Sequence, residues 1–572
     1  MSEAARDRPA DPTRDEPAGD LVSGHGGHLA VAALRAHGVQ TMWTLSGAHV
    51  FPLYDAAVKP VPDDAPPLRL VDVRHEQTAV FAAEATAKLT RSPGLAVLTA
   101  GPGITNGVSA IASAHFNGSP LLVLGGRAPA FRWGTGALQE LDHPPIVASI
   151  TKHAGTIAQT AEITGRVDEA LRLAAQPHRG PVFLDVPVDQ LFSHAESAAP
   201  TGPATGQLEP EPGDLDEIAE LLGAAERPVL VLSSDVWMGG AEAAALAFAE
   251  AVGIPVITTG MGRGILPAGH PQLVTRARGL AFGQADLVLV AGAPLDFRLG
   301  YGAFGGKDGA PAARVVHLTD SPAQIAAHVE LAASAAGCLR SAFEGLHAAF
   351  DQLVRRPGWA PWLDRLRAAA ATAIEADQPM LTAGGDRIHP ARIYGELNRL
   401  LDDDTVVIGD GGDFVSFAGR FVEPRRPGHW LDPGPYGCLG TGLGYAAAAR
   451  VAHPSAPIAL LLGDGAAGFS LMDADTLVRH NLPVVMIVGN NGIWGLEKHP
   501  MRFLYGYDVA AELRQATRYD DVVRALGGAG ETVERPDALG DALRRGFASG
   551  VPYLVNVLTD PDVAYPRTTT GV

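Results

Sequence analysis

The sequence is poor in cysteine. Its 572 residues contain two, Cys338 and Cys438, which lack the close spacing of metal ligands. A disulfide framework and a cysteine-based zinc site are therefore excluded. Sparse cysteine is typical of proteins in a reducing compartment, so we expect a cytoplasmic protein.

Long hydrophobic runs and an excess of basic residues are missing as well. No run of about 18 apolar residues is present that could cross a membrane. The 44 basic and 63 acidic residues give a net charge of −19, which disfavours nucleic acid and anionic membranes as partners. A local pocket can still bind a phosphorylated ligand, because the global charge does not fix the charge of every site.

The chain is too long for a single hydrophobic core and should divide into several domains. Its first 21 residues combine prolines with alternating charges, which predicts a disordered arm. A stretch dense in Pro, Gly, Ala and Glu predicts one linker, and a second is expected ahead of a Gly-Gly turn. The predicted parts are an arm at 1–21, a domain at 22–193, a linker at 194–214, a domain at 215–355, a linker at 356–374, a domain at 375–559 and a tail at 560–572.

Each of the three blocks alternates short apolar runs with helical patterns. PLLVLGG in the first, ADLVLVAG in the second and LPVVMIVGNN in the third are typical of buried parallel strands. The alternation predicts an α/β fold with three doubly wound parallel-sheet domains. Ligands should then bind at the carboxyl ends of the strands, where the Gly-rich turns fall.

The most informative motif is Gly463-Asp464-Gly465, followed after 24 residues by Asn490-Asn491. Each half ends a predicted strand, so Asp464 and Asn491 should converge from neighbouring strands. A carboxylate and an amide oxygen suit Mg²⁺, and the glycines let the backbone approach a diphosphate. Either half alone would be read as an ordinary turn, but the pair in a strand–helix–strand arrangement favours a site.

Two further motifs point to the same chemistry. Arg74-His75-Glu76 ends a predicted strand and precedes an almost wholly apolar helix, so Glu76 is expected in a buried site rather than at an exposed helix start. The segment PGPYGCLGTGLG places the bulky Leu439 among glycines, and TAGPGITN (99–106) forms another glycine turn. Taken alone, the Leu439 segment fits a closely packed helix start equally well.

Together these motifs resemble the thiamine-diphosphate-dependent enzymes over residues 22 to about 565. The resemblance implies a first domain that binds the pyrimidine, a central domain, and a last domain that binds the diphosphate. It implies that Glu76 activates the cofactor through the pyrimidine ring, and that a homodimer or homotetramer shares each site between two chains. The implied metal ligands are Asp464, Asn491 and the carbonyl of Ile493, and the implied cofactor-binding residues are Gly412, Asp413, Phe414, Gly437, Leu439, Gly463, Gly465, Ala466 and Asn491.

Within this family the chain resembles the 2-hydroxyacyl-CoA lyases, in particular a bacterial branch that cleaves 2-hydroxyisobutyryl-CoA. The segment 285–302 lacks the flavin-binding pattern of acetolactate synthases, and the resemblance implies that Arg278, Asp296 and Arg298 bind CoA or ADP in the central domain. The expected reaction releases formyl-CoA and a ketone or aldehyde. The alternatives are an acetolactate synthase that condenses pyruvate, and a catalytically silent cofactor-binding subunit.

The remaining predicted site residues concern the substrate. Glu497 is expected to take the proton of the 2-hydroxyl group, under a lid formed by the aromatic stretch 494–507 and the tail. A surface pair of Glu497 with Lys498 or Arg502 is the alternative. Gln139 is expected to hold the substrate oxygens, and His49 to line the substrate pocket.

Overall fold

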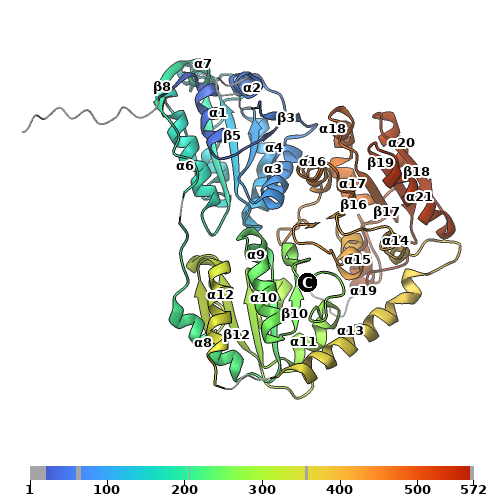
Figure 1. The fold of residues 1–572 in the computed structure, drawn as a ribbon. Helices are drawn as coiled ribbons and strands as arrows, with labels where there is room; N and C mark the ends of the chain where they lie inside the picture. Colours follow the sequence, from blue (N-terminus) through green and yellow to red (C-terminus); the bar gives the residue numbers. More distant parts are fainter. Residues whose placement is uncertain (1–20, 60–65, 205, 355–357, 567–572) are drawn as a thin grey trace, which may run out of the picture.

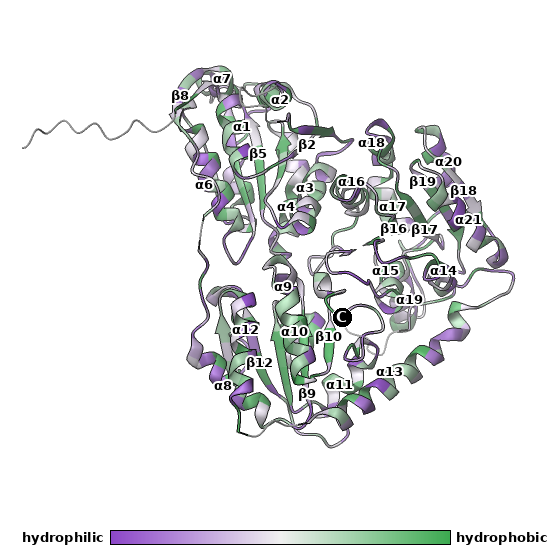
Figure 2. Ribbon diagram, viewed as in Figure 1, coloured by the Kyte–Doolittle hydropathy of each residue, from purple (hydrophilic) through white to green (hydrophobic). Residues whose placement is uncertain are grey.

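The computed structural model describes residues 21–59, 66–204, 206–354 and 358–566, so residues 1–20 of the predicted arm at 1–21 and the last six residues of the tail lie outside the described residues. The described chain forms three α/β units, each built on a parallel sheet (Figure 1). This confirms the predicted fold class. Apolar strands lie between helices whose outer faces are hydrophilic (Figure 2). No helix in the described ranges is long and apolar enough to span a membrane.

The first unit contains a six-stranded sheet in the order β3-β2-β4-β5-β7-β6. A separate antiparallel pair, β1 with β8, joins the start of this unit to its end. Its strands are β1 (Leu21–His25), β2 (Thr41–Thr44), β3 (Arg69–Asp72), β4 (Gly94–Leu98), β5 (Leu121–Arg127), β6 (His153–Thr156), β7 (Pro181–Pro187) and β8 (His194–Ala198). Its helices are α1 (Gly26–Ala36), α2 (Phe51–Val58), α3 (Glu76–Thr90), α4 (Pro102–Phe116), α5 (Pro144–Val147), α6 (Ile163–Ala175) and α7 (Val188–Phe192).

The second unit contains a five-stranded sheet in the order β10-β9-β11-β12-β13. Its strands are β9 (Pro228–Leu232), β10 (Val256–Thr258), β11 (Leu287–Ala291), β12 (Arg314–Thr319) and β13 (Ala333–Ala336). Its helices are α8 (Pro212–Gly223), α9 (Ser234–Met238), α10 (Glu242–Val252), α11 (Arg278–Gln284) and α12 (Leu339–Asp351).

The third unit has the strand order β15-β14-β16-β17-β19-β18. The register pairs Gly463 with Gly489, so the chain leaves β16 and β17 side by side. Its strands are β14 (Val406–Asp410), β15 (Trp430–Leu431), β16 (Ile458–Gly463), β17 (Val485–Asn490), β18 (Ala529–Val533) and β19 (Tyr553–Leu558). Its helices are α14 (Pro390–Leu397), α15 (Asp413–Phe421), α16 (Gly442–Ala452), α17 (Asp464–Ser470), α18 (Ala474–Arg479), α19 (Gly495–Tyr505), α20 (Tyr519–Ala525) and α21 (Pro536–Ala548).

The connections between units contain regular secondary structure. The segment 194–214 begins with β8 and ends in the first turn of α8. Most of the segment 356–374 belongs to a 22-residue helix, α13 (Ala360–Leu381), which runs from the second unit to the third (Figure 1). Trp362 and Leu366 of α13 pack in the core of the second unit, and the Trp362 indole donates to the carbonyl of Pro228 at 3.1 Å. A helix forms here because its apolar residues recur at helical spacing.

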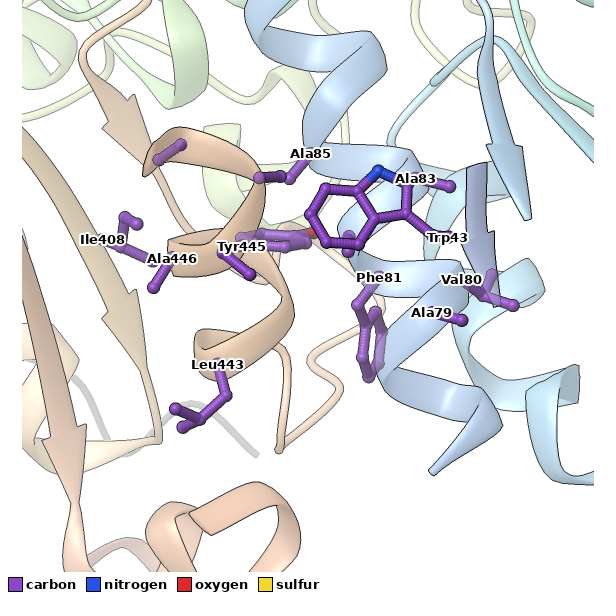
Figure 3. Close-up of a cluster of buried hydrophobic side chains, with 14 of the residues drawn as sticks. Trp43, Ala79, Val80, Phe81, Ala83, Ala85, Ile408, Leu443, Tyr445 and Ala446 are labelled. Atoms are coloured by element: carbon purple, nitrogen blue, oxygen red, sulfur yellow. The ribbon is translucent and has the colours of Figure 1, made fainter. Parts of the chain in front are cut away.

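The first and third units pack through α3 and α16. The Tyr445 ring of α16 meets the Phe81 ring of α3 edge-on, with centroids 6.2 Å apart, beside Trp43 of β2 (Figure 3). A side chain on Gly444 would come within 2.9 Å of the Thr78 carbonyl, so glycine permits this close approach. The apolar character of α3 therefore reflects helix packing between units as well as the site at its N-terminus.

Candidate active site

The carboxyl edge of the third sheet opens into a cavity of about 510 Å³. Residues of the second unit form its opposite wall, so the cavity lies between two units. It is lined by every residue that the sequence assigned to the cofactor or the metal, namely Gly412, Asp413, Phe414, Gly437, Leu439, Gly463, Asp464, Gly465, Ala466, Asn491 and Ile493. Their convergence follows from the parallel order β14-β16-β17, which places the ends of these strands next to one another.

Asp464 is the first residue of α17 and is 3% exposed. Burial raises the pKa of Asp464 to about 6, although hydrogen bonds from backbone amides partly oppose the shift. The amide of Gly492 donates to Oδ2 at 2.6 Å and that of Gly465 to Oδ1 at 3.0 Å. A buried carboxylate of this kind is stabilised in its charged form by a bound cation.

The loop after β17 presents two further oxygen ligands. Asn491 Oδ1 accepts a hydrogen bond from the Ile493 amide at 3.1 Å, which fixes the orientation of its side chain. The flanking backbone pairs with a second segment, because Leu513 donates to Gly492 and Trp494 donates to Ala511. This pair of bonds does not use the Ile493 carbonyl. A carboxylate, an amide oxygen and a backbone carbonyl make a ligand set that fits Mg²⁺.

Glycine residues surround these metal ligands. A side chain on Gly412 would come within 2.4 Å of Leu496, and one on Gly465 would come within 2.5 Å of the Trp494 ring. Gly411 adopts a left-handed φ of +125°, and its added Cβ would lie 3.2 Å from the Gly463 nitrogen. Glycine at these positions permits the close packing of the loops around the metal ligands, and the 510 Å³ cavity that Gly412 and Gly465 line has space for a diphosphate, so the residues present fit this cofactor group.

Asp410, which ends β14, belongs to no motif identified from the sequence. Its carboxylate accepts the amides of Gly440 at 3.1 Å and Gly442 at 2.8 Å, and burial raises its pKa to about 6. These bonds fix the loop that carries Gly437 and Leu439. The strand-end position of Asp410 in TVVIGD was the available signal, since polar groups at such ends are typical of sites.

Arg263 of the second unit also lines the cavity. No sequence motif identified this residue. Its guanidinium lies 4.2 Å from the Trp430 ring centroid and donates to the Gly419 carbonyl at 3.0 Å. Its Nε is buried without a hydrogen-bond partner among the described residues. Arg263 therefore links the second unit to α15, and its guanidinium pairs with Glu423 at 3.5 Å.

The three residues predicted to bind CoA or ADP lie close together, because Asp296 and Arg298 follow β11 and Arg278, the first residue of α11, contacts Arg298. Arg298 lines the main cavity and pairs with Asp296 at 2.7 Å, and Arg278 donates to the Arg298 carbonyl. Asp296 also lines a second cavity of about 350 Å³ with Tyr301 and His328. Burial, followed by the charge of Arg298, lowers the pKa of Arg278.

Glu76 lies at the start of α3 and is 8% exposed. Its Oε2 accepts a hydrogen bond from the Asn106 side chain of α4 at 3.0 Å. Asn106 is the last residue of the TAGPGITN motif, and its role was not predicted. Glu76 is not one of the described residues that line the 510 Å³ cavity.

His49 and Gln139 occupy the carboxyl edge of the first sheet. His49 Nδ1 lies 3.2 Å from Thr99 Oγ1, and burial lowers the pKa of the His49 ring. A side chain on Gly101 would come within 2.9 Å of Gln139, so these loops pack closely. His143 bonds to Asp185 and to the Gly101 amide, which makes it a structural residue. Neither His49 nor Gln139 lines the 510 Å³ cavity as described for this single chain.

Glu497 lies in the first turn of α19 and lines the cavity, but it is exposed. The proposed surface partners are engaged elsewhere, because Lys498 pairs with Glu512 and Arg502 pairs with Asp508. The described part of the tail packs against the third unit, where the Tyr565 ring lies 5.0 Å from that of Phe417 in α15.

Comparisons with known proteins cover nearly the whole chain. Models of the thiamine pyrophosphate enzymes match as the N-terminal TPP binding domain over residues 24–146, the central domain over 215–346 and the C-terminal TPP binding domain over 410–557. The acetolactate synthase large subunit IlvG of Mycobacterium tuberculosis is 50% identical over 95% of this chain and 97% of its own length. The 2-hydroxyacyl-CoA lyase 2 proteins of Caenorhabditis elegans and Homo sapiens are 34% and 31% identical over 93% of this chain, and 89% and 90% of theirs.

Proposed function

Because the chain belongs to the thiamine pyrophosphate enzyme family, we propose that it is a lyase that cleaves 2-hydroxyacyl-CoA next to the thioester carbonyl. The products are formyl-CoA and a ketone or aldehyde, and the favoured substrate is 2-hydroxyisobutyryl-CoA. When bound, thiamine diphosphate supplies a nucleophilic carbon and an electron sink for this reaction. The chain's own residues hold the cofactor, orient the substrate and move protons.

The third unit would hold Mg²⁺ and the diphosphate. Asp464, Asn491 and the Ile493 carbonyl would bind the metal, and the backbone of Gly412 and Gly465 would face the diphosphate. The Asp410 carboxylate would keep the Leu439 loop in place beneath the rest of the cofactor. Glu76 would hold or deliver a proton at the pyrimidine ring.

The complete site would require two copies of the chain. Asp464 and Glu497 line the 510 Å³ cavity, whereas Glu76, His49 and Gln139 lie at the edge of the first sheet, outside the described lining. A second copy in a homodimer or homotetramer would bring its first unit over this cavity. The same contact would shield Glu497, which is exposed in one chain.

The observation that carries the substrate proposal is the extent of the cavity. It continues from the metal ligands to Phe297 and Arg298 of the second unit. Arginine side chains bind phosphate groups well, so Arg298 with the neighbouring Arg278 suits the nucleotide end of CoA, or ADP. Pyruvate would not need the length of this cavity. The lyases among the relatives agree with an acyl-CoA substrate.

Within this site, Glu497 would accept the proton of the substrate 2-hydroxyl group. Its position one turn beyond the metal loop keeps its backbone close to the reacting carbon. Gln139 of the second copy would donate to the thioester oxygen. His49, whose lowered pKa keeps the ring neutral, would line the substrate pocket and is the second candidate for the base.

The second candidate function is condensation of pyruvate to acetolactate, because a relative of that name is 50% identical to this chain. The purified protein with thiamine diphosphate and Mg²⁺ should be incubated with 2-hydroxyisobutyryl-CoA and, separately, with pyruvate. We expect formyl-CoA and acetone from the first. Acetolactate from pyruvate without acyl-CoA cleavage would overturn the lyase proposal.

Arg298→Gln tests the CoA assignment. We expect a higher KM for the acyl-CoA with little change in kcat, because the residue would bind a remote part of the substrate equally in the ground and transition states. Arg365→Gln, on the exposed face of α13, is the matched control. An unchanged KM in Arg298→Gln would remove this residue from the CoA site.

A further inference from the structure

A buried cluster of charged side chains joins the first unit to the second. His178 and Arg179 come from the loop before β7, Asp235 from α9, and Asp320 from the residue after β12. His178 Nδ1 lies 3.3 Å from Asp320 Oδ1 and 3.8 Å from Asp235 Oδ2. One ligand atom from each of His178, Asp235 and Asp320 lies within 4.8 Å of the other two. The proposed reaction uses none of these residues.

The two carboxylates are deeply buried. Asp235 is 7% exposed and Asp320 is 5% exposed. Arg179 neutralises one side of the cluster by contacting Asp320 Oδ2 at 3.2 Å. The Asp235 carboxylate pairs with the His178 ring, whose Nδ1 lies 3.8 Å from Oδ2. Burying a carboxylate in this way is costly unless a cation accompanies it.

The other cations near the cluster are engaged. Lys152 Nζ donates to the carbonyls of Gln176 at 2.7 Å and His178 at 2.8 Å. Arg298 forms its ion pair with Asp296. Of the cations in the described part of the chain, only His178 forms an ion pair with Asp235, and a bound ion would add further positive charge.

Close packing holds the cluster in shape and limits the size of any ligand. A side chain on Gly118 would come within 2.5 Å of the His178 ring, and one on Gly292 within 3.1 Å of Asp235 Cβ. This close packing leaves space between His178, Asp235 and Asp320 for an ion rather than for an organic molecule.

We propose that His178, Asp235 and Asp320 bind one divalent cation, of the Zn²⁺ or Mn²⁺ class, between the first and second units. One imidazole nitrogen and two carboxylate oxygens suit these ions, and the imidazole favours them over Mg²⁺. In a tetrahedral site the ligand atoms lie roughly 3.3 Å apart, which is already the His178–Asp320 spacing. The His178 proton would reside on Nε2, so that Nδ1 can bind the ion.

A second group of metal-binding side chains, His25, His28 and Asp55, serves as the control. His25 is already bonded on both nitrogens, since Nδ1 accepts the Gly27 amide and Nε2 contacts Asp55. Lys59 also donates to the same oxygen of Asp55 at 2.6 Å. Because these bonds satisfy His25 and Asp55, this group is less suited to a metal.

The test uses the protein loaded with thiamine diphosphate and excess Mg²⁺, titrated with ZnCl₂ in a calorimeter. We expect one zinc ion per chain and a higher thermal midpoint in its presence. Asp235→Asn, which preserves the shape of the side chain, and His178→Gln should each weaken binding at least about tenfold, whereas His28→Gln should not.

Two results would overturn the proposal. One is a wild-type protein that binds no zinc under these conditions. The other is zinc binding that survives in Asp235→Asn but is lost in His28→Gln, which would assign the ion to the control group. Circular dichroism of each variant establishes that the fold is intact.

Discussion

At the scale of single residues, the site depends on carboxylates in different surroundings. Asp464 and Asp410 are enclosed by backbone amides and have raised pKa values, Glu76 is held by one side-chain amide, and Glu497 is exposed in the single chain. A carboxylate enclosed by backbone amides can bind a metal or hold a loop in place. An exposed carboxylate must first be shielded from water before it can act as a base in a dry pocket.

Glu76→Gln tests activation. The variant should bind thiamine diphosphate about as well as the wild type, because Glu76 lies apart from the metal and diphosphate ligands. Exchange of the thiazolium C2 proton, followed by NMR, should slow by about 10²–10⁴-fold, the usual contribution of a general acid–base group. Exchange at the wild-type rate would remove Glu76 from the mechanism.

Glu497→Gln tests the substrate base. Cleavage of 2-hydroxyacyl-CoA should fall by about 10²–10⁴-fold, since the 2-hydroxyl proton then lacks an acceptor, while C2 exchange continues. Glu512→Gln, which changes an exposed carboxylate of the same region, is the control. Cleavage at a near wild-type rate in Glu497→Gln would direct attention to His49.

At the scale of elements, Asp168 of α6 ties three segments together. It contacts His37 Nε2 at 2.8 Å and accepts hydrogen bonds from Thr201 and from the Gly202 amide. Burial alone would raise the pKa of Asp168, but these hydrogen bonds prevail and lower it to about 2. Asp168 thereby joins the end of α1 to the chain that leaves the first unit.

The lowered pKa fixes the sign of a pH dependence. Because the folded pKa is about 2 and the unfolded value is 3.8, Asp168 stabilises the fold above pH 4 and loses this effect as the pH falls toward 2. The stabilisation is about 2 kcal/mol. Asp168→Asn should lower the thermal midpoint at pH 7, and its difference from the wild type should shrink below pH 4. Asp216→Asn, on the exposed face of α8, should show neither effect.

Much of the secondary structure and part of the site could be predicted from the sequence. The alternation of strands and helices identified the parallel sheets, and the motif spacing identified residues that line one cavity. Asp410 and Arg263 were not identified, because their importance depends on which loop or ring they contact in three dimensions. Helix α13 was interpreted as a linker because its apolar residues alone do not reveal a neighbouring domain.

At the scale of the whole molecule, a site shared between two chains has a direct test. Asp464→Ala and Glu76→Gln should each be inactive alone. Mixing the two variants, with subunit exchange, should restore about a quarter of wild-type activity, because half of the dimers are mixed and each contains one intact site. Equal mixing without any recovery, despite exchange seen by mass spectrometry, would place the whole site in one chain.

Helix α13 has a consequence for how the large cavity can change shape. Its 22 residues span about 33 Å, and one end is fixed in the second unit by Trp362. Near the other end, Asp377 binds both Arg276 of the second unit and Arg420 of α15. A rigid spacer fixed at both ends resists separation of the two units along its length. The wall with Arg298 can therefore approach or leave the wall with Glu497 mainly by rotation, so opening for CoA would resemble a hinge whose axis runs along this helix.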